Sequence, residues 1–132
     1  MCIFCKIIHH EIPSSVVYED DNTLAILDIS QVTRGHTLVM PKKHVANILE
    51  ADAETVAQCA ETVRKLAKQI VENTGAPGCN ILNNTHEVAG QSVDHLHFHI
   101  IPRYDENDAV VISFNESKPQ DLAEVLKTLR GE

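Results

Sequence analysis

The segment Asp94–Pro102 reads Asp-His-Leu-His-Phe-His-Ile-Ile-Pro, and histidine alternates in it with apolar residues. Successive side chains of a β-strand point to opposite faces of the sheet, so this alternation predicts a strand over residues 94–102. On that strand His95, His97 and His99 share one face, while the apolar residues share the other. Because histidine has no particular preference for strands, three in register indicate a functional role rather than a solvent-facing edge.

Five segments have the composition and pattern of strands. The first two are expected to form a hairpin around the turn cluster Asp20-Asp21-Asn22. Pro41 ends the third, because proline cannot donate to a strand ladder. In chain order the expected strands are residues 15–19, 23–28, 36–40, 79–83 and 94–102.

Two segments have the pattern of amphipathic helices. The apolar positions within residues 53–71 follow one helical face, after a suitable N-cap at Asp52 and before a stop at Asn73-Thr74-Gly75. Near the C-terminus, Ser117 and Gln120 form a capping-box pattern that predicts a closing helix. Strands outnumber helices and do not alternate with them. The sequence therefore predicts an α+β fold with a five-stranded antiparallel sheet, rather than a doubly wound fold.

The chain has 132 residues, of which 43% are hydrophobic and 23% are charged. These values are typical of an ordinary soluble protein, and the length suits a single domain over residues 1–132. A net charge of -8 argues against binding of a nucleic-acid polymer, although a few N–H groups can still hold one phosphate. No apolar stretch reaches the roughly 20 residues of a membrane span, and the N-terminal residues lack a signal-peptide layout. We expect a cytoplasmic protein.

Aligned imidazoles suit two kinds of chemistry: a metal centre, or a nucleophilic histidine whose neighbours fix its tautomer. The tripeptide Gly90-Gln91-Ser92 stands just before the predicted strand and offers N–H groups, an amide and a hydroxyl. Such donors suit phosphate oxygens better than a cation. A metal centre made by all three histidines would also need a further ligand that no motif identifies. The loop and the histidines together form a candidate anion site.

The run Gly90–Ile101 resembles the signature of the histidine triad (HIT) proteins, a family of nucleotide hydrolases and transferases. Upstream, Leu24–Ser30 and Gly35–His44 match the ribose-binding and second-strand blocks of that family. The resemblance covers residues 2–103, beyond which a helical extension is expected over 117–130. It implies a HIT-like fold in which the five antiparallel strands extend to ten across the two-fold axis of a homodimer.

The resemblance also implies roles for single residues. His97 would attack the α-phosphorus of a purine nucleotide and carry a transient nucleotidyl group, until water releases AMP or GMP. His99 would contact the phosphate or the leaving group, and His36 would lie behind the triad. Asp28 would accept hydrogen bonds from the ribose. The residues implied to hold phosphate oxygens are Asn84, Gly90, Gln91 and Ser92, and those implied to surround the base are Phe4, Ile7, Ile26, Ile29 and Leu38.

Two branches of the family differ in substrate. Pro102-Arg103 and the C-terminal helix resemble the branch that hydrolyses dinucleoside polyphosphates, whereas the short length and Ser92 resemble the branch that hydrolyses nucleoside phosphoramidates. The leaving group therefore stays open. The alternative to an enzyme is a module that binds a nucleotide or a partner with little turnover, because such a module would keep the same pocket.

Cys2-Ile3-Phe4-Cys5 has the spacing of metal ligands, but it supplies only two of the four that structural zinc normally takes. Some HIT proteins of this type complete a zinc site with two histidines, which correspond here to His44 and His95. Four protein ligands leave no open position, so such a site would be structural rather than catalytic. Free thiols and a redox pair are the alternatives.

Overall fold

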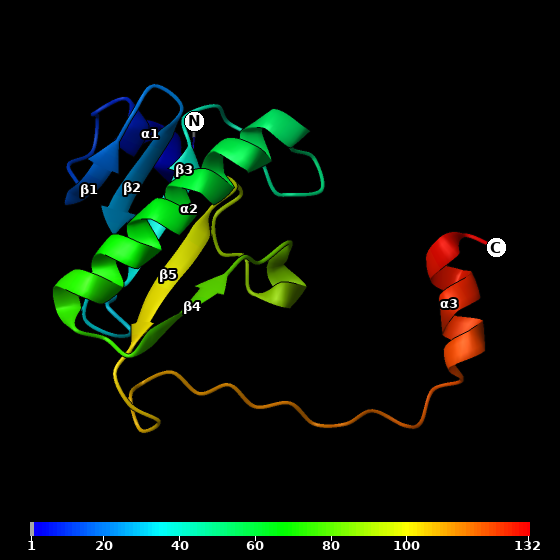
Figure 1. The fold of residues 1–132 in the computed structure, drawn as a ribbon. Coiled ribbons are helices and arrows are strands. Elements are labelled where there is room, and N and C mark those ends of the chain that lie inside the picture. The colour runs from blue at the N-terminus through cyan, green and yellow to red at the C-terminus, as the bar shows by residue number, and fades with distance from the viewer. Residues whose placement is uncertain (1) are drawn as a thin grey trace.

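The computed structural model describes residues 2–132, so the first residue of the expected domain lies outside the described part. Its centre is a five-stranded antiparallel sheet in the order β1-β2-β3-β5-β4 (Figure 1). This sheet confirms the predicted fold class. The strands are β1 (Val16–Glu19), β2 (Thr23–Leu27), β3 (Thr37–Pro41), β4 (Gly78–Leu82) and β5 (Phe98–Arg103).

The predicted hairpin is the first part of this sheet. Asp20 fixes its turn, because one carboxylate oxygen accepts hydrogen bonds from the N–H groups of Asn22 and Thr23, each at 2.8 Å. The next pairing, between β2 and β3, is regular from Thr23 opposite Pro41 to Leu27 opposite Thr37. Pro41 is thus the last residue of β3 rather than the residue after it.

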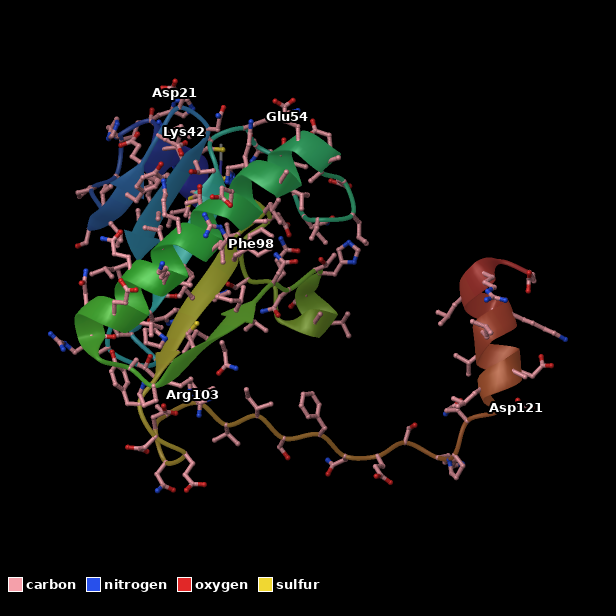
Figure 2. The ribbon with its side chains drawn as sticks, viewed as in Figure 1. Asp21, Lys42, Glu54, Phe98, Arg103 and Asp121 are labelled. Atoms are coloured by element: carbon pink, nitrogen blue, oxygen red, sulfur yellow. The ribbon has the colours of Figure 1, made fainter. Side chains whose placement is uncertain are left out.

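The helix α2 (Ala53–Thr74) covers one face of the sheet (Figure 1). It begins and ends as predicted: Asp52 accepts from the N–H of Thr55 at 2.7 Å, and Gly75 ends it with a left-handed φ of 74°. In Figure 2 the labelled Phe98 of β5 lies beneath this helix. The core between α2 and the sheet consists of Ala25, Val39, Val63, Leu66 and Ile100.

The opposite face carries α1 (Ile3–Ile8), a helix that the sequence did not predict. Six residues are too few to establish a periodicity, and the N-cap is Cys2, whose sulfur accepts from the N–H of Cys5 at 3.2 Å. Phe4 and Ile8 of α1 pack on the sheet with Leu24, Ile26, Leu38 and Met40. Both faces of the sheet are therefore covered, and α1 lies on the face opposite α2.

The strand predicted over residues 94–102 begins later, at Phe98. Its pairing with β4 ends at His99 opposite Leu82, and its pairing with β3 ends at Phe98 opposite Val39. Residues 94–97 precede these ladders. The N–H of Leu96 instead donates to the carbonyl of Val45 at 2.8 Å. His95 and His97 thus lie in the lead-in to the strand, residues 94–97, which begins with a bend and is bonded to a loop rather than to a neighbouring strand.

The C-terminal helix α3 (Leu122–Arg130) differs from its prediction in cap and in packing. Its N-cap is Asp121, which accepts from the N–H groups of Ala123 and Glu124, whereas Ser117 and Gln120 lie before the helix. Figure 1 shows α3 standing apart from the sheet at the end of an extended segment. Among residues 2–132, no helix combines the length and the apolar character that a membrane crossing requires.

Candidate active site

His97 is held in one orientation by its neighbours. Its ring nitrogen Nδ1 lies 2.7 Å from the carbonyl oxygen of His95, to which it donates. Because a neutral imidazole carries a single N–H, this bond leaves the lone pair of Nε2 free. The side chain is only 6% exposed, and its ring meets the ring of Phe4 edge to face, with the centroids 5.0 Å apart. Burial lowers the pKa of His97, which favours the neutral form.

A chain of hydrogen bonds fixes the tautomer of His99. The N–H of Val32 donates to Nδ1 of His36 at 3.4 Å, so the proton of His36 lies on Nε2. That Nε2–H donates to Nδ1 of His99 at 2.9 Å, which places the remaining N–H of His99 on Nε2. The rings of His97 and His99 are 5.1 Å apart. Burial and the neighbouring His97 and His36 lower the pKa of His99 to about 4. The site therefore presents one free lone pair and, beside it, one N–H donor.

Asp28 follows the end of β2 and lies between the hydrogen-bonded pair His36–His99 and an apolar cavity. One carboxylate oxygen accepts from the N–H of Ser30 at 2.8 Å, which is the turn-forming role expected of an aspartate there. The other oxygen lies 3.7 Å from Nε2 of His36. Asp28 thus keeps an acceptor available at the edge of the cavity.

The cavity has a volume of about 650 Å³ and lies between α1 and the end of β2. Four residues expected around the base and ribose line it: Ile7, Ile26, Asp28 and Ile29. Two others, Phe4 and Leu38, are not among the lining residues and pack in the core cluster beneath α1, to which Ile26 also belongs. Sequence reasoning had no means of separating core from cavity wall, because both are apolar. The cavity is also lined by Ile3, Ile12 and Leu27, which were not expected there. Ile3 was missed because α1 was not predicted.

The loop between β4 and β5 forms a second, polar hollow of about 590 Å³, lined by Glu87, Gly90, Gln91, Ser92 and Asp94. Gly90 has a left-handed φ of 100°, and a Cβ there would lie 3.2 Å from the side-chain nitrogen of Asn84. The position therefore requires glycine. Asn84 donates to the carbonyl of Gly90 at 3.4 Å, and Ser92 is exposed to solvent.

Gln91, one of the residues expected to hold phosphate oxygens, is bonded within the protein. Its side chain is 5% exposed and donates to the carbonyls of Ala46 and Val93, while its amide oxygen accepts from the N–H of His86. Its own N–H donates to the carbonyl of His86. All these groups are occupied within the protein, so Gln91 shapes the loop and has no free donor for a ligand.

Cys2, Cys5, His44 and His95 bring four ligand atoms together. Sulfur-to-Nδ1 distances are 3.3 to 3.6 Å, and the two Nδ1 atoms are 3.2 Å apart. Around a tetrahedral zinc ion, ligand bonds of about 2.3 Å to sulfur and about 2.0 Å to nitrogen separate sulfur from nitrogen by about 3.5 Å and two nitrogens by about 3.3 Å. Nε2 of His95 donates to the carbonyl of Pro41 at 2.8 Å, which leaves Nδ1 free to bind. The donors fit a tetrahedral metal ion.

The three histidines therefore belong to three different groupings. Within residues 2–132, His95 clusters with the cysteines, and His99 groups with Asp28 and His36, whereas His97 belongs to neither potential metal site. This geometry opposes a single metal held jointly by the triad. It also opposes a solvent-facing edge, because His95 is fully buried.

Asn83 is a site residue that the sequence analysis missed. It follows the last residue of β4, and its Nδ2 donates to the carbonyl oxygen of His97 at 2.9 Å. The side chain thereby extends the β4–β5 ladder by one bond, at the point where the main chain turns away into the polar loop. An amide directly after a strand was the available signal, although asparagine after a strand is more often read as a turn.

A model of the HIT domain matches residues 9–106. The chain belongs to the HIT family. A HIT-like protein of Methanocaldococcus jannaschii is 50% identical over 99% of this chain and 100% of its own length. A protein of Schizosaccharomyces pombe named adenosine 5'-monophosphoramidase is 43% identical over 80% of this chain and 76% of its own. A crystal structure of a HIT protein from Bacillus subtilis, 47% identical, superposes with a TM-score of 0.91 and covers 98% of this chain and 95% of its own.

Proposed function

We propose that this HIT protein hydrolyses purine nucleotides at the α-phosphate and releases AMP or GMP. The substrate is a nucleoside phosphoramidate or a dinucleoside polyphosphate, and His97 carries the nucleotidyl group between the two steps. The observation that carries the proposal is the hydrogen bond from Nδ1 of His97 to the His95 carbonyl, because it leaves Nε2 free to attack. The phosphoramidase activity named for the relative from S. pombe supports the first kind of substrate.

In the first step, the lone pair on Nε2 of His97 forms a bond to the α-phosphorus. The bond to the leaving nitrogen or oxygen breaks, and that atom keeps the electron pair and takes a proton from water. In the second step, the hydroxide that remains attacks phosphorus, the bond to Nε2 breaks, and neutral His97 returns. The Nε2–H of His99 donates to a phosphoryl oxygen as negative charge develops there.

The other contacts are assigned to the two hollows, the apolar cavity and the polar hollow of the β4–β5 loop. The purine base fits the apolar cavity lined by Ile7, Ile26 and Ile29, and the free carboxylate oxygen of Asp28 accepts from the ribose hydroxyls. Ser92 and the loop shaped by Gly90 face the phosphate from the other hollow. The Asn84 amide, one N–H of which donates to the Gly90 carbonyl, offers its second N–H as a donor. Gln91 holds this loop in place.

The cluster of Cys2, Cys5, His44 and His95 would hold zinc, because its donor types and spacing match tetrahedral coordination. Zinc bound there supplies no reactive position, because all four ligands come from the protein. Its contribution is to fix α1 against the lead-in to β5. Phe4 on α1 in turn packs against the ring of His97.

The edge strand β4 is the proposed surface for homodimer formation, which would give a ten-stranded sheet. Its residues, Gly78 to Leu82, include no proline and no charged residue. Ile81 and Leu82 are also 48% and 42% exposed. Proline and charged residues usually protect the edge strands of monomers from pairing with another chain. An edge without them favours pairing with a second strand.

The test is AMP release by the purified chain from an adenosine phosphoramidate and from a diadenosine polyphosphate. His97→Ala should abolish turnover, whereas His9→Ala, which changes an exposed histidine outside the site, should retain it. Acid-free quenching during turnover should reveal a chain heavier by one nucleotidyl group. Full activity in His97→Ala would overturn the proposal. Stoichiometric nucleotide binding without turnover, over a panel of leaving groups, would instead indicate a binding module.

A further inference from the structure

The C-terminal arm, residues Val111–Glu132, packs against no other part of the chain among residues 2–132. From Val111 to Gln120 every residue is exposed, and none of the residues in α3 is buried. In Figure 2, Arg103 marks the foot of the arm on the sheet, and Asp121 marks the start of α3, well away from it. Beyond Val110, the hydrogen bonds found in residues 2–132 join only residues of the arm to one another.

The helix at the end of the arm needs an apolar surface to cover it. Leu122, Leu126 and Leu129 follow helical spacing along one side, and they are 77%, 46% and 79% exposed. An isolated helix shorter than about 12 residues is marginal in water, so α3, with nine residues, requires packing from outside. The sequence of α3 therefore specifies a buried side that the chain itself does not bury.

The foot of the arm is fixed rather than free. Nε of Arg103 donates to both carboxylate oxygens of Asp108, at 2.9 and 3.0 Å, and its two terminal nitrogens donate to Asn80 and to the carbonyl of Val110. The hydroxyl of Tyr104 donates to the carbonyl of Arg34. These bonds tie the residues just before the arm to β4 and to the loop before β3, and they set the direction in which the arm leaves.

That direction leads past the open edge of the sheet. Figure 1 shows the arm running along the β4 side, with α3 standing beyond the same side. This side also carries the exposed apolar residues Ile81 and Leu82 of β4. A protein molecule paired with β4 would therefore lie between the sheet and α3, within reach of the arm.

A second copy of the chain is the occupant that the comparisons favour. The superposition on the Bacillus subtilis crystal structure covers 98% of this chain with a TM-score of 0.91, so it extends through the arm. An arm folded back onto its own body would lower that score. A tail without a packing partner would not be expected to follow the same course in this protein and in the relative. The partner available to each of the two proteins is a second copy of its own chain.

We propose that the C-terminal arm is an exchange arm: it crosses the β4 edge of a second copy, lays the apolar side of α3 on that copy, and receives the partner's arm in return. The two contacts are equivalent under a two-fold axis, as in a domain-swapped dimer. The inference rests on the proposed pairing at β4 and is independent of the proposed activity.

Two variants test the exchange by sedimentation over a dilution series. A chain that ends at Val110 and the double variant Leu126→Ser/Leu129→Ser should both raise the dimer dissociation constant by roughly tenfold or more, because each leucine loses buried apolar area. Glu124→Gln, on the polar side of α3, should match the wild type. The double variant keeps the arm, so it answers the question even if the shortened chain fails to fold.

Amine cross-linking of mixed dimers distinguishes exchange from folding back. Dimers are re-formed from equal amounts of ¹⁵N-labelled and unlabelled full chain, and the cross-links of Lys127 on α3 to lysines of residues 2–103 are identified by mass. Links between labelled and unlabelled peptides support exchange, whereas links only within one chain, or none, overturn it. A monomeric full chain would overturn both the pairing at β4 and the exchange. A shortened chain that dimerises like the wild type would overturn the exchange alone.

Discussion

The Nδ1–H group of His97 and the carbonyl oxygen of His95 form a hydrogen bond of 2.7 Å. A main-chain oxygen thus sets the tautomer of the proposed nucleophile. The main chain of His97 is held in turn by Asn83, whose Nδ2 donates to the His97 carbonyl at 2.9 Å. Ring and backbone of the same residue are therefore fixed by two separate bonds, and each bond can be tested.

Removal of the Asn83 bond should lower kcat more than it changes KM. Asn83→Asp replaces the donor by an oxygen that repels the His97 carbonyl, and we expect kcat to fall by roughly tenfold or more, which corresponds to about 1.4 kcal/mol. Asn73→Asp, on the exposed end of α2, is the matched control. Equal loss in both variants, or a change confined to KM, would contradict a role in positioning His97.

His36 should act through His99. His36→Leu removes the donor that keeps the proton of His99 on Nε2, and we expect kcat to fall by roughly tenfold to a hundredfold. His36→Gln retains an N–H near the position of Nε2 and should restore part of the loss. Because the proposed bond goes to a phosphoryl oxygen, good and poor leaving groups should suffer alike. A larger loss with poor leaving groups would place the donor at the leaving atom instead.

The cysteine cluster should bind one zinc ion per chain in protein purified without chelator. Cys5→Ser should lose the metal and about 2 kcal/mol or more of unfolding free energy, because zinc binding contributes to folding stability. Cys79→Ser, which changes a cysteine on β4, should keep both. Elemental analysis and chemical denaturation measure the two effects. Wild-type protein without stoichiometric metal would remove the zinc site from the proposal.

Stability should fall as the pH drops from about 6.5 towards 4. The pKa of His99 is 6.5 in the unfolded chain and about 4 in the folded one, so within this window only the unfolded state takes up the proton. Unfolding therefore becomes easier with acid. Because solvent reaches part of the ring, we expect His99 to account for on the order of 1 kcal/mol of this loss. Urea denaturation of wild type and His99→Asn should show a smaller pH dependence in the variant.

The sequence was sufficient for the features that depend on local patterns. The alternation of residues 94–102 identified the sheet and the three histidines, and Asp52 and Gly75 bounded α2 correctly. The helix α1 was missed because it has only six residues and takes a cysteine as its cap. Local patterns also could not show that β5 begins at Phe98, because the first paired residue of a strand depends on where the neighbouring strands stop.

Other parts of the site depend on contacts between distant segments. Gln91 looked like a phosphate donor, but its amide is occupied by the carbonyls of Ala46 and Val93. Phe4 and Leu38 were expected around the base, but both pack in the core beneath α1. In both cases the residue type suggested a role, but the sequence did not show which residues it would contact in the folded protein. The bond from Asn83 to His97 is of the same kind, because it joins residues that only the folded chain brings together.

The acceptor that orients His97 is the carbonyl of residue 95, and every amino acid has that group. The imidazole of His95, by contrast, serves the cysteine cluster. Replacement of the cysteines, or even of His95, therefore leaves in place the main-chain acceptor on which the proposed nucleophile depends. The four-ligand cluster and the proposed reaction thus use different groups of the same residue, so the loss of one does not by itself remove the other.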